Sequence, residues 1–220
     1  MDFPLTTQID LWFTRLDENL YQPSFLKFLS PDEVRRAEKF RFDLHRKRFI
    51  ITRAALRSIL SLYVKIKPKN IQIQYADRGK PFILSSLQFN LSHSHERAVF
   101  AIANQVQVGI DIEKIRSDYK DEVAKRFFST EEYEAFALLP HSQKVTNFFK
   151  IWTQKEALVK ATGEGLARLH SLSREVWHIK ECFLFTDYTI ALATNKIITH
   201  LTYWEWTDHD YFPLSPSRSL

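Results

Sequence analysis

Two pairs of segments in this chain echo each other, and this internal similarity constrains the fold more than any other feature. Residues 49–56 (FIITRAAL) follow Ser30-Pro-Asp-Glu33, and residues 149–158 (FKIWTQKEAL) follow Ser129-Thr-Glu-Glu132. Each amphipathic stretch thus comes after a serine and early acidic residues, the pattern of a helix N-cap with acids in its first turn. A second pair, residues 100–104 (FAIAN) and 190–194 (IALAT), consists of short apolar runs typical of buried strands.

Chance similarity between short apolar segments would explain either echo alone, but both occur in the same order in each half. The pattern therefore predicts an α+β fold of two pseudo-symmetric subdomains, each a small antiparallel sheet packed on a long helix. We place the boundary between Gln107 and Val108, giving subdomains 1–107 and 108–212. Residues 213–220, rich in Pro and Ser, are expected to form a disordered tail. Two joined subdomains leave a cleft between them, and such clefts commonly bind ligands.

Acidic residues in the second half form a candidate metal site. Asp111 and Glu113 lie two apart in the β-branched context of residues 108–114 (VGIDIEK), so on a strand both carboxylates project from one face. Glu156 and Lys160, four apart in a helix-forming run, share a helix face. Three carboxylates without a nearby Cys or His suit Mg²⁺, and a lysine beside them suggests a phosphate-bearing substrate. The alternative is that each group is an ordinary surface charge.

These segments occur with further short motifs in a fixed order. The series comprises Ser30-Pro31, a basic stretch around Arg48, Gly79-Lys-Pro81, Asn90-Leu-Ser-His-Ser94, Gly109-Ile-Asp-Ile-Glu113, Arg126-Phe-Phe-Ser129 and Trp152 through Leu166. The ordered set resembles the 4′-phosphopantetheinyl transferase family, in its monomeric double-domain (surfactin-synthetase-activating) type. The resemblance implies an enzyme that transfers the 4′-phosphopantetheine group of coenzyme A to a serine of an apo acyl or peptidyl carrier protein. Adenosine 3′,5′-bisphosphate would leave after Mg²⁺-assisted attack on the β-phosphate.

The resemblance also implies roles for individual residues. Asp111, Glu113 and Glu156 would bind Mg²⁺, and Lys160 would contact the pyrophosphate. The nucleotide end of coenzyme A would lie against Arg36, Arg48, Lys80, Ser92 and His93. Three acceptors for the serine proton stay open: Glu156, Glu132 and a metal-bound hydroxide. Glu33 departs from the family pattern, because a basic residue can occur there. Without the resemblance, Arg48 reads equally well as part of a solvated helix face, and His93 as a partner for a loop backbone.

Composition limits the compartment and the partners. The single cysteine, Cys182, excludes an internal disulfide framework, and no apolar run approaches the ~18 residues needed to span a bilayer. Asp2 and Asp10 stand where a signal peptide would be basic and then apolar, so we expect a cytoplasmic protein without a membrane partner. One chain carrying both halves of a site predicts a functional monomer. A formal charge of +5 favours acidic partners, among them an acidic carrier protein.

Two other function classes compete with the transferase. A metal-dependent nuclease or phosphodiesterase also uses clustered carboxylates and lysine. A non-catalytic nucleic-acid-binding module would use the basic charge, but the Lys and Arg residues are scattered among acids and form no recognised nucleic-acid motif. We therefore expect no nucleic-acid partner.

Overall fold

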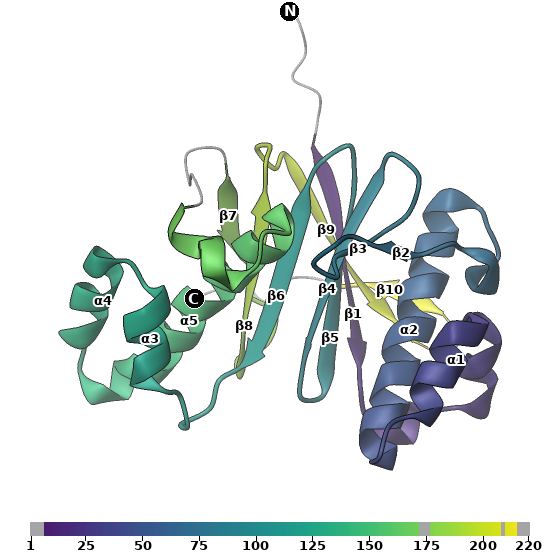
Figure 1. The fold of residues 1–220 in the computed structure, drawn as a ribbon, viewed down its shortest axis with the longest axis horizontal. Coiled ribbons are helices and arrows are strands. Elements are labelled where there is room, and N and C mark those ends of the chain that lie inside the picture. Colours follow the sequence, from purple (N-terminus) through teal and green to yellow (C-terminus); the bar gives the residue numbers. More distant parts are fainter. Residues whose placement is uncertain (1–6, 172–176, 208–209, 215–220) are drawn as a thin grey trace, which may run out of the picture.

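Two β-sheets lie at the centre of the molecule, and helices cover them from opposite sides (Figure 1). The computed structural model describes residues 7–171, 177–207 and 210–214. The first sheet has the strand order β10-β9-β1-β5-β4, and the second has the order β6-β8-β7. The strands of the first sheet are β1 (Gln8–Arg15), β4 (Leu87–Ser94), β5 (Arg97–Asn104), β9 (His200–Trp206) and β10 (Tyr211–Pro213). Those of the second sheet are β6 (Val108–Lys114), β7 (His178–Glu181) and β8 (Tyr188–Thr194).

Smaller elements connect these strands. A short antiparallel pair joins β2 (Gln74–Tyr75) and β3 (Pro81–Phe82). The helices are α1 (Pro31–Glu38), α2 (Asp43–Val64), α3 (Asp121–Phe127), α4 (Thr130–Ala137) and α5 (His141–Thr162). Four 3-10 turns lie at Glu18–Leu20, Pro23–Phe28, Pro68–Asn70 and Leu166–Ser171. None of the helices within the described ranges is both long and apolar enough to cross a membrane.

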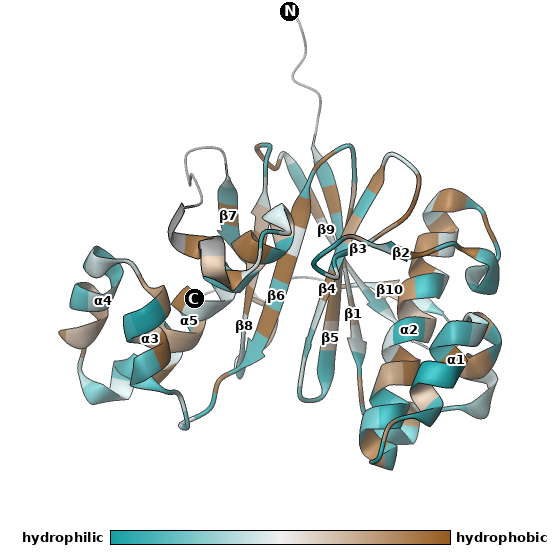
Figure 2. Cartoon of the chain, in the orientation of Figure 1, coloured by the Kyte–Doolittle hydropathy of each residue, from teal (hydrophilic) through white to brown (hydrophobic). Residues whose placement is uncertain are grey.

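One long helix packs on each sheet, so the expected α+β fold of two parts is confirmed. Helices α2 and α5 each have 22 residues. The buried side of α2, including Ile51, Leu56 and Leu60, packs in one cluster with Phe89 and Phe100 of the first sheet. In Figure 2 hydrophobic residues run along β6 and recur on α2, whereas α1 and α4 carry large hydrophilic stretches. The apolar runs that suggested buried strands and amphipathic helices thus form the sheet cores and the inner helix faces.

Helix α5 approaches the second sheet unusually closely. Four alanines, Ala157 and Ala161 of α5 and Ala191 and Ala193 of β8, belong to one buried cluster between the helix and the sheet. On β6 the facing residue is Gly109, where a Cβ atom would lie 2.1 Å from the carbonyl oxygen of Ala157. Because no larger side chain separates them, the helix backbone lies directly on strand β6.

In both halves a serine begins a helix, as the echo had suggested, and the glutamate three residues later makes similar contacts. A capping box begins α1 at Ser30 and Glu33, and another begins α4 at Ser129 and Glu132. In each half the capping-box glutamate also binds a buried cation of the following long helix. Glu33 binds Arg53 and Arg57, and Glu132 binds Lys155. Arg53 and Lys155 occupy equivalent positions in the echoing segments, three residues before Leu56 and Leu158.

The last strands cross back to the first sheet, which departs from a clean division at residue 107. Strand β9 pairs in parallel with β1, and β10 pairs with β9. Aromatic packing stabilises the position of β9 beside β1, since Trp204 stacks on Trp12 with ring centroids 5.6 Å apart. A hydrogen bond of 2.5 Å from Thr202 to Asp10 adds a polar contact. By pairing with β1, β9 covers an edge that would otherwise expose unpaired backbone groups. The expected tail begins at Pro213 inside β10, and its residues 215–220 lie outside the described residues.

Candidate functional site

The two sheets meet at their edge strands, β4 and β6, and we call this contact the seam. Polar side chains of β4 cross it at every second position. The Asn90 amide oxygen accepts a hydrogen bond of 3.0 Å from the backbone N–H of Ile110. Ser92 donates to Asp111 at 2.7 Å, and Ser94 donates to Glu113 at 2.9 Å. The alternation of the strand places all three donors or acceptors on one side of β4, so side chains join two strands that share no sheet.

The acidic cluster lies on this seam. Asp111 is 3% exposed, and Glu113 and Glu156 are half-buried. Lys160 reaches across from α5, with its Nζ 2.6 Å from Asp111 Oδ1 and 2.8 Å from Ser92 Oγ. The sequence spacing put Asp111 and Glu113 on one strand face, and Glu156 and Lys160 on one helix face. In the structure these two faces adjoin at the seam, so the four side chains lie in one region.

The carboxylates influence one another electrostatically. Burial raises the pKa of Glu156 to about 7, and the charges of Asp111 and Glu113 add to the rise against the opposing effect of Lys160. Burial, followed by the charge of Asp111, also raises the pKa of Glu113. The pKa of Asp111 is raised by burial, although Lys160 and Ser92 oppose the change. All three pKa values are thus raised mainly by burial, and Lys160 opposes the rise only in part.

This donor set fits a hard divalent cation. Asp111 Oδ2 is buried and has no hydrogen-bond partner, so one oxygen remains available for a ligand. A cation beside Asp111, Glu113 and Glu156 would reverse the electrostatic penalty on all three. Within the described ranges, no three His, Cys, Asp or Glu side chains already converge on one point. Lys160 occupies the neighbouring oxygen of Asp111, so the side chains have to shift to share an ion.

A cavity of about 690 Å³ adjoins the acidic cluster on the side of α1 and α2. Arg36, Arg48 and His93 line it, together with Glu113 and Arg116. Burial lowers the pKa of His93, and the charges of Lys160 and Arg48 lower it further. A slightly larger hollow of about 790 Å³ lies elsewhere, beside the end of α2, but no Lys, Arg, Asp or Glu lines it. Because of its cationic lining, the cavity of about 690 Å³ is better suited than this hollow to a phosphate-bearing ligand.

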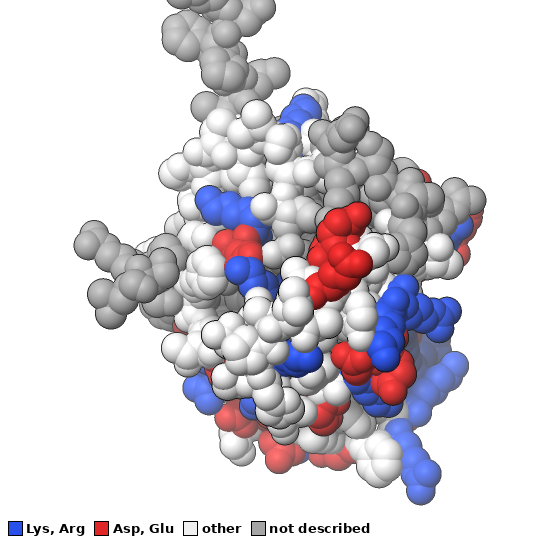
Figure 3. Space-filling view, turned by 90° about the vertical axis from the view of Figure 1, so that its left-hand side faces the viewer, with Lys and Arg blue, Asp and Glu red and all other residues white. Residues whose placement is uncertain are grey.

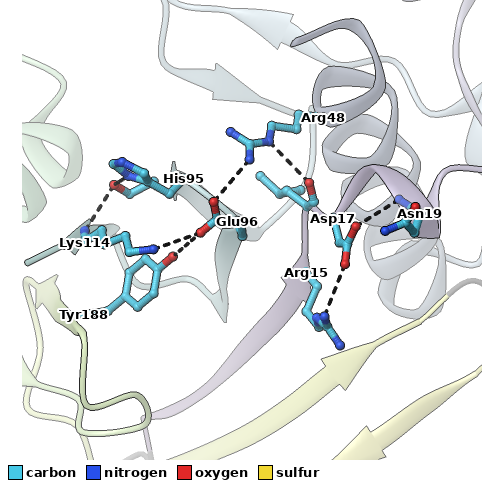
Figure 4. Close-up of polar contacts among 10 residues, drawn as sticks. Arg15, Asp17, Asn19, Arg48, His95, Glu96, Lys114 and Tyr188 are labelled. Carbon is cyan, nitrogen blue, oxygen red and sulfur yellow. Dashed lines mark hydrogen bonds and ion pairs between the residues drawn. The ribbon is translucent and has the colours of Figure 1, made fainter. Parts of the chain in front are cut away.

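Glu96, which the sequence had not singled out, joins the two halves beside this cavity (Figure 4). Its carboxylate accepts from Arg48 of α2 at 3.5 Å, from Lys114 of β6 at 3.2 Å and from Tyr188 of β8 at 3.3 Å. Arg48 also donates to the backbone carbonyl of Leu16 at 3.3 Å. Arg48 is therefore oriented by Leu16 and Glu96 of its own half rather than lying on a solvated helix face, and Glu96 connects it to Lys114 and Tyr188 of the second half. Glu96 lies in the turn between β4 and β5, and a lone Glu there carries no sequence signal for this role.

Three other expected site residues have polar partners within the protein. Lys80 directs its ammonium group to the backbone carbonyls of Val108 and Ala161, at 3.2 and 2.7 Å. The Glu132 carboxylate accepts from the Ser129 backbone N–H at 2.7 Å and from buried Lys155 at 2.6 Å. Ser92, expected on the nucleotide, instead donates to Asp111. The expectations for these three residues rested on motif position, which does not reveal which partner a side chain faces.

Comparison with known proteins gives a consistent result over most of the chain. A family model described as the 4′-phosphopantetheinyl transferase superfamily matches residues 107–211, and one described as 4′-phosphopantetheinyl transferase, N-terminal, matches residues 20–105. The 4′-phosphopantetheinyl transferase HetI of Nostoc is 44% identical over 176 residues, which cover 76% of this chain and 74% of the relative. The 4′-phosphopantetheinyl transferase Sfp of Bacillus subtilis is 31% identical over 145 residues, covering 65% and 64% respectively.

Proposed function

Because the chain belongs to the 4′-phosphopantetheinyl transferase family, we propose that it moves the 4′-phosphopantetheine group of coenzyme A to a serine of an apo acyl or peptidyl carrier protein. The observation that carries the proposal is that two regions of opposite charge adjoin each other. An acidic cluster with Lys160 lies on the seam, and a cationic cavity with Arg36, Arg48 and His93 opens beside it. The pair suits a ligand that carries a pyrophosphate and a separate further phosphate.

In this proposal the adenosine end of coenzyme A, with its 3′-phosphate, occupies the cavity. Arg48 and His93 supply donors to that phosphate, and Arg36 adds positive charge at the same wall. The pyrophosphate then lies over the seam, where Lys160 leaves Asp111 Oδ1 to contact it. The Ser92 hydroxyl holds the Asp111 carboxylate in place during this exchange.

Asp111, Glu113 and Glu156 are the proposed ligands of Mg²⁺. When bound, Mg²⁺ would neutralise charge that builds on the leaving phosphate. The two serines of β4 orient the first two ligands, because each donates to one carboxylate and leaves the other oxygens free.

The serine of the carrier needs a proton acceptor as it attacks the β-phosphorus. Glu156 suits this role better than Glu132. Its carboxyl is half-buried beside Asp111 and Glu113 on the seam, where the pyrophosphate is proposed to lie. The Glu132 carboxylate is bound to Lys155 and to the Ser129 backbone N–H.

The carrier is proposed to be acidic, since the chain has a formal charge of +5. Figure 3 views the molecule from the side of α3 and α4, and basic and acidic side chains are intermingled on this face. Electrostatic attraction would therefore act through separate basic side chains rather than through one uniform patch. One chain contributes both the cavity and the acidic cluster, so we propose that the enzyme acts as a monomer.

The decisive experiment is incubation of the protein with coenzyme A, Mg²⁺ and an apo carrier protein, followed by intact-mass measurement of the carrier. We expect a gain of one phosphopantetheine and an equal amount of adenosine 3′,5′-bisphosphate. A carrier with its acceptor serine changed to alanine is the control and should not gain mass. Absence of transfer to several unrelated apo carriers, together with cleavage of nucleic acid by the same preparation, would favour the nuclease class instead.

A further inference from the structure

Lys80 belongs to the first half of the chain, in the turn that joins β2 and β3. Hydrogen bonds of 2.7 Å from Gly79 N to Ala76 O and of 2.9 Å from Ala76 N to Lys80 O close this turn. Gly79 has a φ of +82°, a left-handed conformation that suits glycine. Gly79 and Pro81, the two neighbours of Lys80, line the cationic cavity. The backbone around Lys80 thus forms part of the proposed nucleotide site.

The side chain of Lys80 leaves that cavity and crosses to the second half. Its Nζ donates to the carbonyl of Val108 at 3.2 Å and to the carbonyl of Ala161 at 2.7 Å. Its stem passes Gly163, where an added Cβ would lie 3.6 Å from Lys80 Cδ. Val108 begins β6 and Ala161 lies in the last turn of α5, so one side chain contacts two segments of the second half.

Both carbonyls are suited to a cationic donor. Ala161 is among the last four residues of α5, whose carbonyls have no partner within the helix and carry the negative end of the helix dipole. Burial lowers the pKa of Lys80 to about 8, and no acidic side chain contributes to the change. Even a neutral amine keeps two N–H groups, enough for the two carbonyls. The contact is therefore a partly buried link to two backbone carbonyls, not an ion pair.

The groups next to these carbonyls are those of the proposed chemistry. Ala161 directly follows Lys160, and Val108 directly precedes Gly109, on which α5 lies backbone to backbone. A shift of either carbonyl would move Lys160 relative to Asp111, which its Nζ contacts at 2.6 Å.

We propose that Lys80 is a positioning residue that fixes the end of α5 and the start of β6 against the nucleotide-side turn, and so sets Lys160 and Asp111 relative to the bound substrate. The inference rests on the proposed function, and it reassigns Lys80 from gripping the nucleotide to aligning the site. It also links the two halves, because the turn that lines the cavity carries the side chain that orders the acidic cluster.

The test is Lys80→Met, which keeps most of the stem and removes the donors, with Lys69→Met at an exposed position as the matched control. We expect kcat to fall by roughly 10–100-fold, the usual range for a residue that orients a site. The ratio of kcat/KM for coenzyme A to that for dephospho-coenzyme A should stay at the wild-type value. Hydrogen exchange should rise in residues 157–163 and 107–110. A higher KM for coenzyme A, loss of the preference over dephospho-coenzyme A and unchanged exchange would overturn the proposal and show that Lys80 grips the 3′-phosphate.

Chemical rescue separates the role of the Lys80 amine from an effect of the mutation on the stability of the protein. In Lys80→Cys, alkylation with 2-bromoethylamine rebuilds a lysine-like side chain, whereas a methylthio adduct of similar bulk carries no donor. The native Cys182 is 3% exposed and its pKa is raised by burial, so it should react slowly. Aminoethylation should restore kcat and slow exchange, and the methylthio adduct should not. Equal restoration by both adducts would refute the role of the amine. The exchange comparison needs no turnover, so it tests the link even if wild-type protein fails to modify any carrier.

Discussion

Replacing Gly109 by alanine tests the close packing of α5 on β6, which places the acidic cluster. The added Cβ would lie 2.1 Å from Ala157 O, 2.2 Å from Ala161 N and 2.7 Å from Ala161 Cα. Since real Cβ contacts essentially never fall below 3.0 Å, strand and helix would have to separate by roughly 0.9 Å (3.0 minus 2.1). All three obstructing atoms belong to the backbone, so no side-chain rotation relieves them.

Overpacking of this kind typically costs about 1–3 kcal/mol, and a clash with backbone belongs at the upper end of that range. For a chain of this size about 3 kcal/mol corresponds to a Tm lowered by roughly 6–12 °C, at 2–4 °C per kcal/mol. Activity should fall further than stability alone predicts, because a misplacement of about 1 Å can cost on the order of 100-fold. We expect a protein that is folded at 20 °C and transfers poorly.

The assay is thermal unfolding by circular dichroism, with carrier modification measured well below the midpoint. Gly79→Ala is the matched control for stability, because its Cβ would meet nothing within 4 Å and only the φ of +82° opposes it. That strain should cost about 1 kcal/mol. If Gly109→Ala unfolds at the wild-type temperature and transfers normally, α5 does not lie on β6 as described, and the argument for the seam fails.

Three further changes test the proposed roles. Glu113→Gln should leave folding intact and lower turnover by more than the roughly 10–100-fold typical of an outer partner, and wild-type turnover at limiting Mg²⁺ would remove Glu113 from the site. His93→Ala should weaken coenzyme A binding by about 1–3 kcal/mol, measured by calorimetry, and should lose most of any preference over dephospho-coenzyme A; equal losses for both ligands would exclude contact with the 3′-phosphate. The pKa of Glu156 is raised to about 7, so without metal the folded state binds the extra proton and stability falls as pH rises from about 4.5 to 7. Glu156→Gln should therefore raise Tm relative to wild type at pH 8 but not at pH 4, and a constant difference would contradict the shift.

The local spacing of the sequence anticipated much of this arrangement. Period-two alternation in residues 108–114 put Asp111 and Glu113 on one face, and the four-residue spacing in α5 did the same for Glu156 and Lys160. The serines at residues 30 and 129 stand at the N-cap positions of α1 and α4, with acids in the first turn, as their context indicated. These predictions succeed because strand and helix geometry fixes the relative directions of side chains only a few residues apart.

Tertiary structure alone decided which distant groups meet. The chain does not reveal that Lys80 turns from the cavity to Ala161, or that Lys155 is the partner of Glu132, because each side chain has several partners within reach until the helices are packed. Nor does the sequence show that β9 returns to β1, since its apolar residues would serve either sheet. Short-range geometry set the directions of the side chains along each element. The partners of those side chains were decided by the close contact of α5 with β6 and by the contact between β4 and β6. Both contacts depend on how segments far apart in the chain pack together.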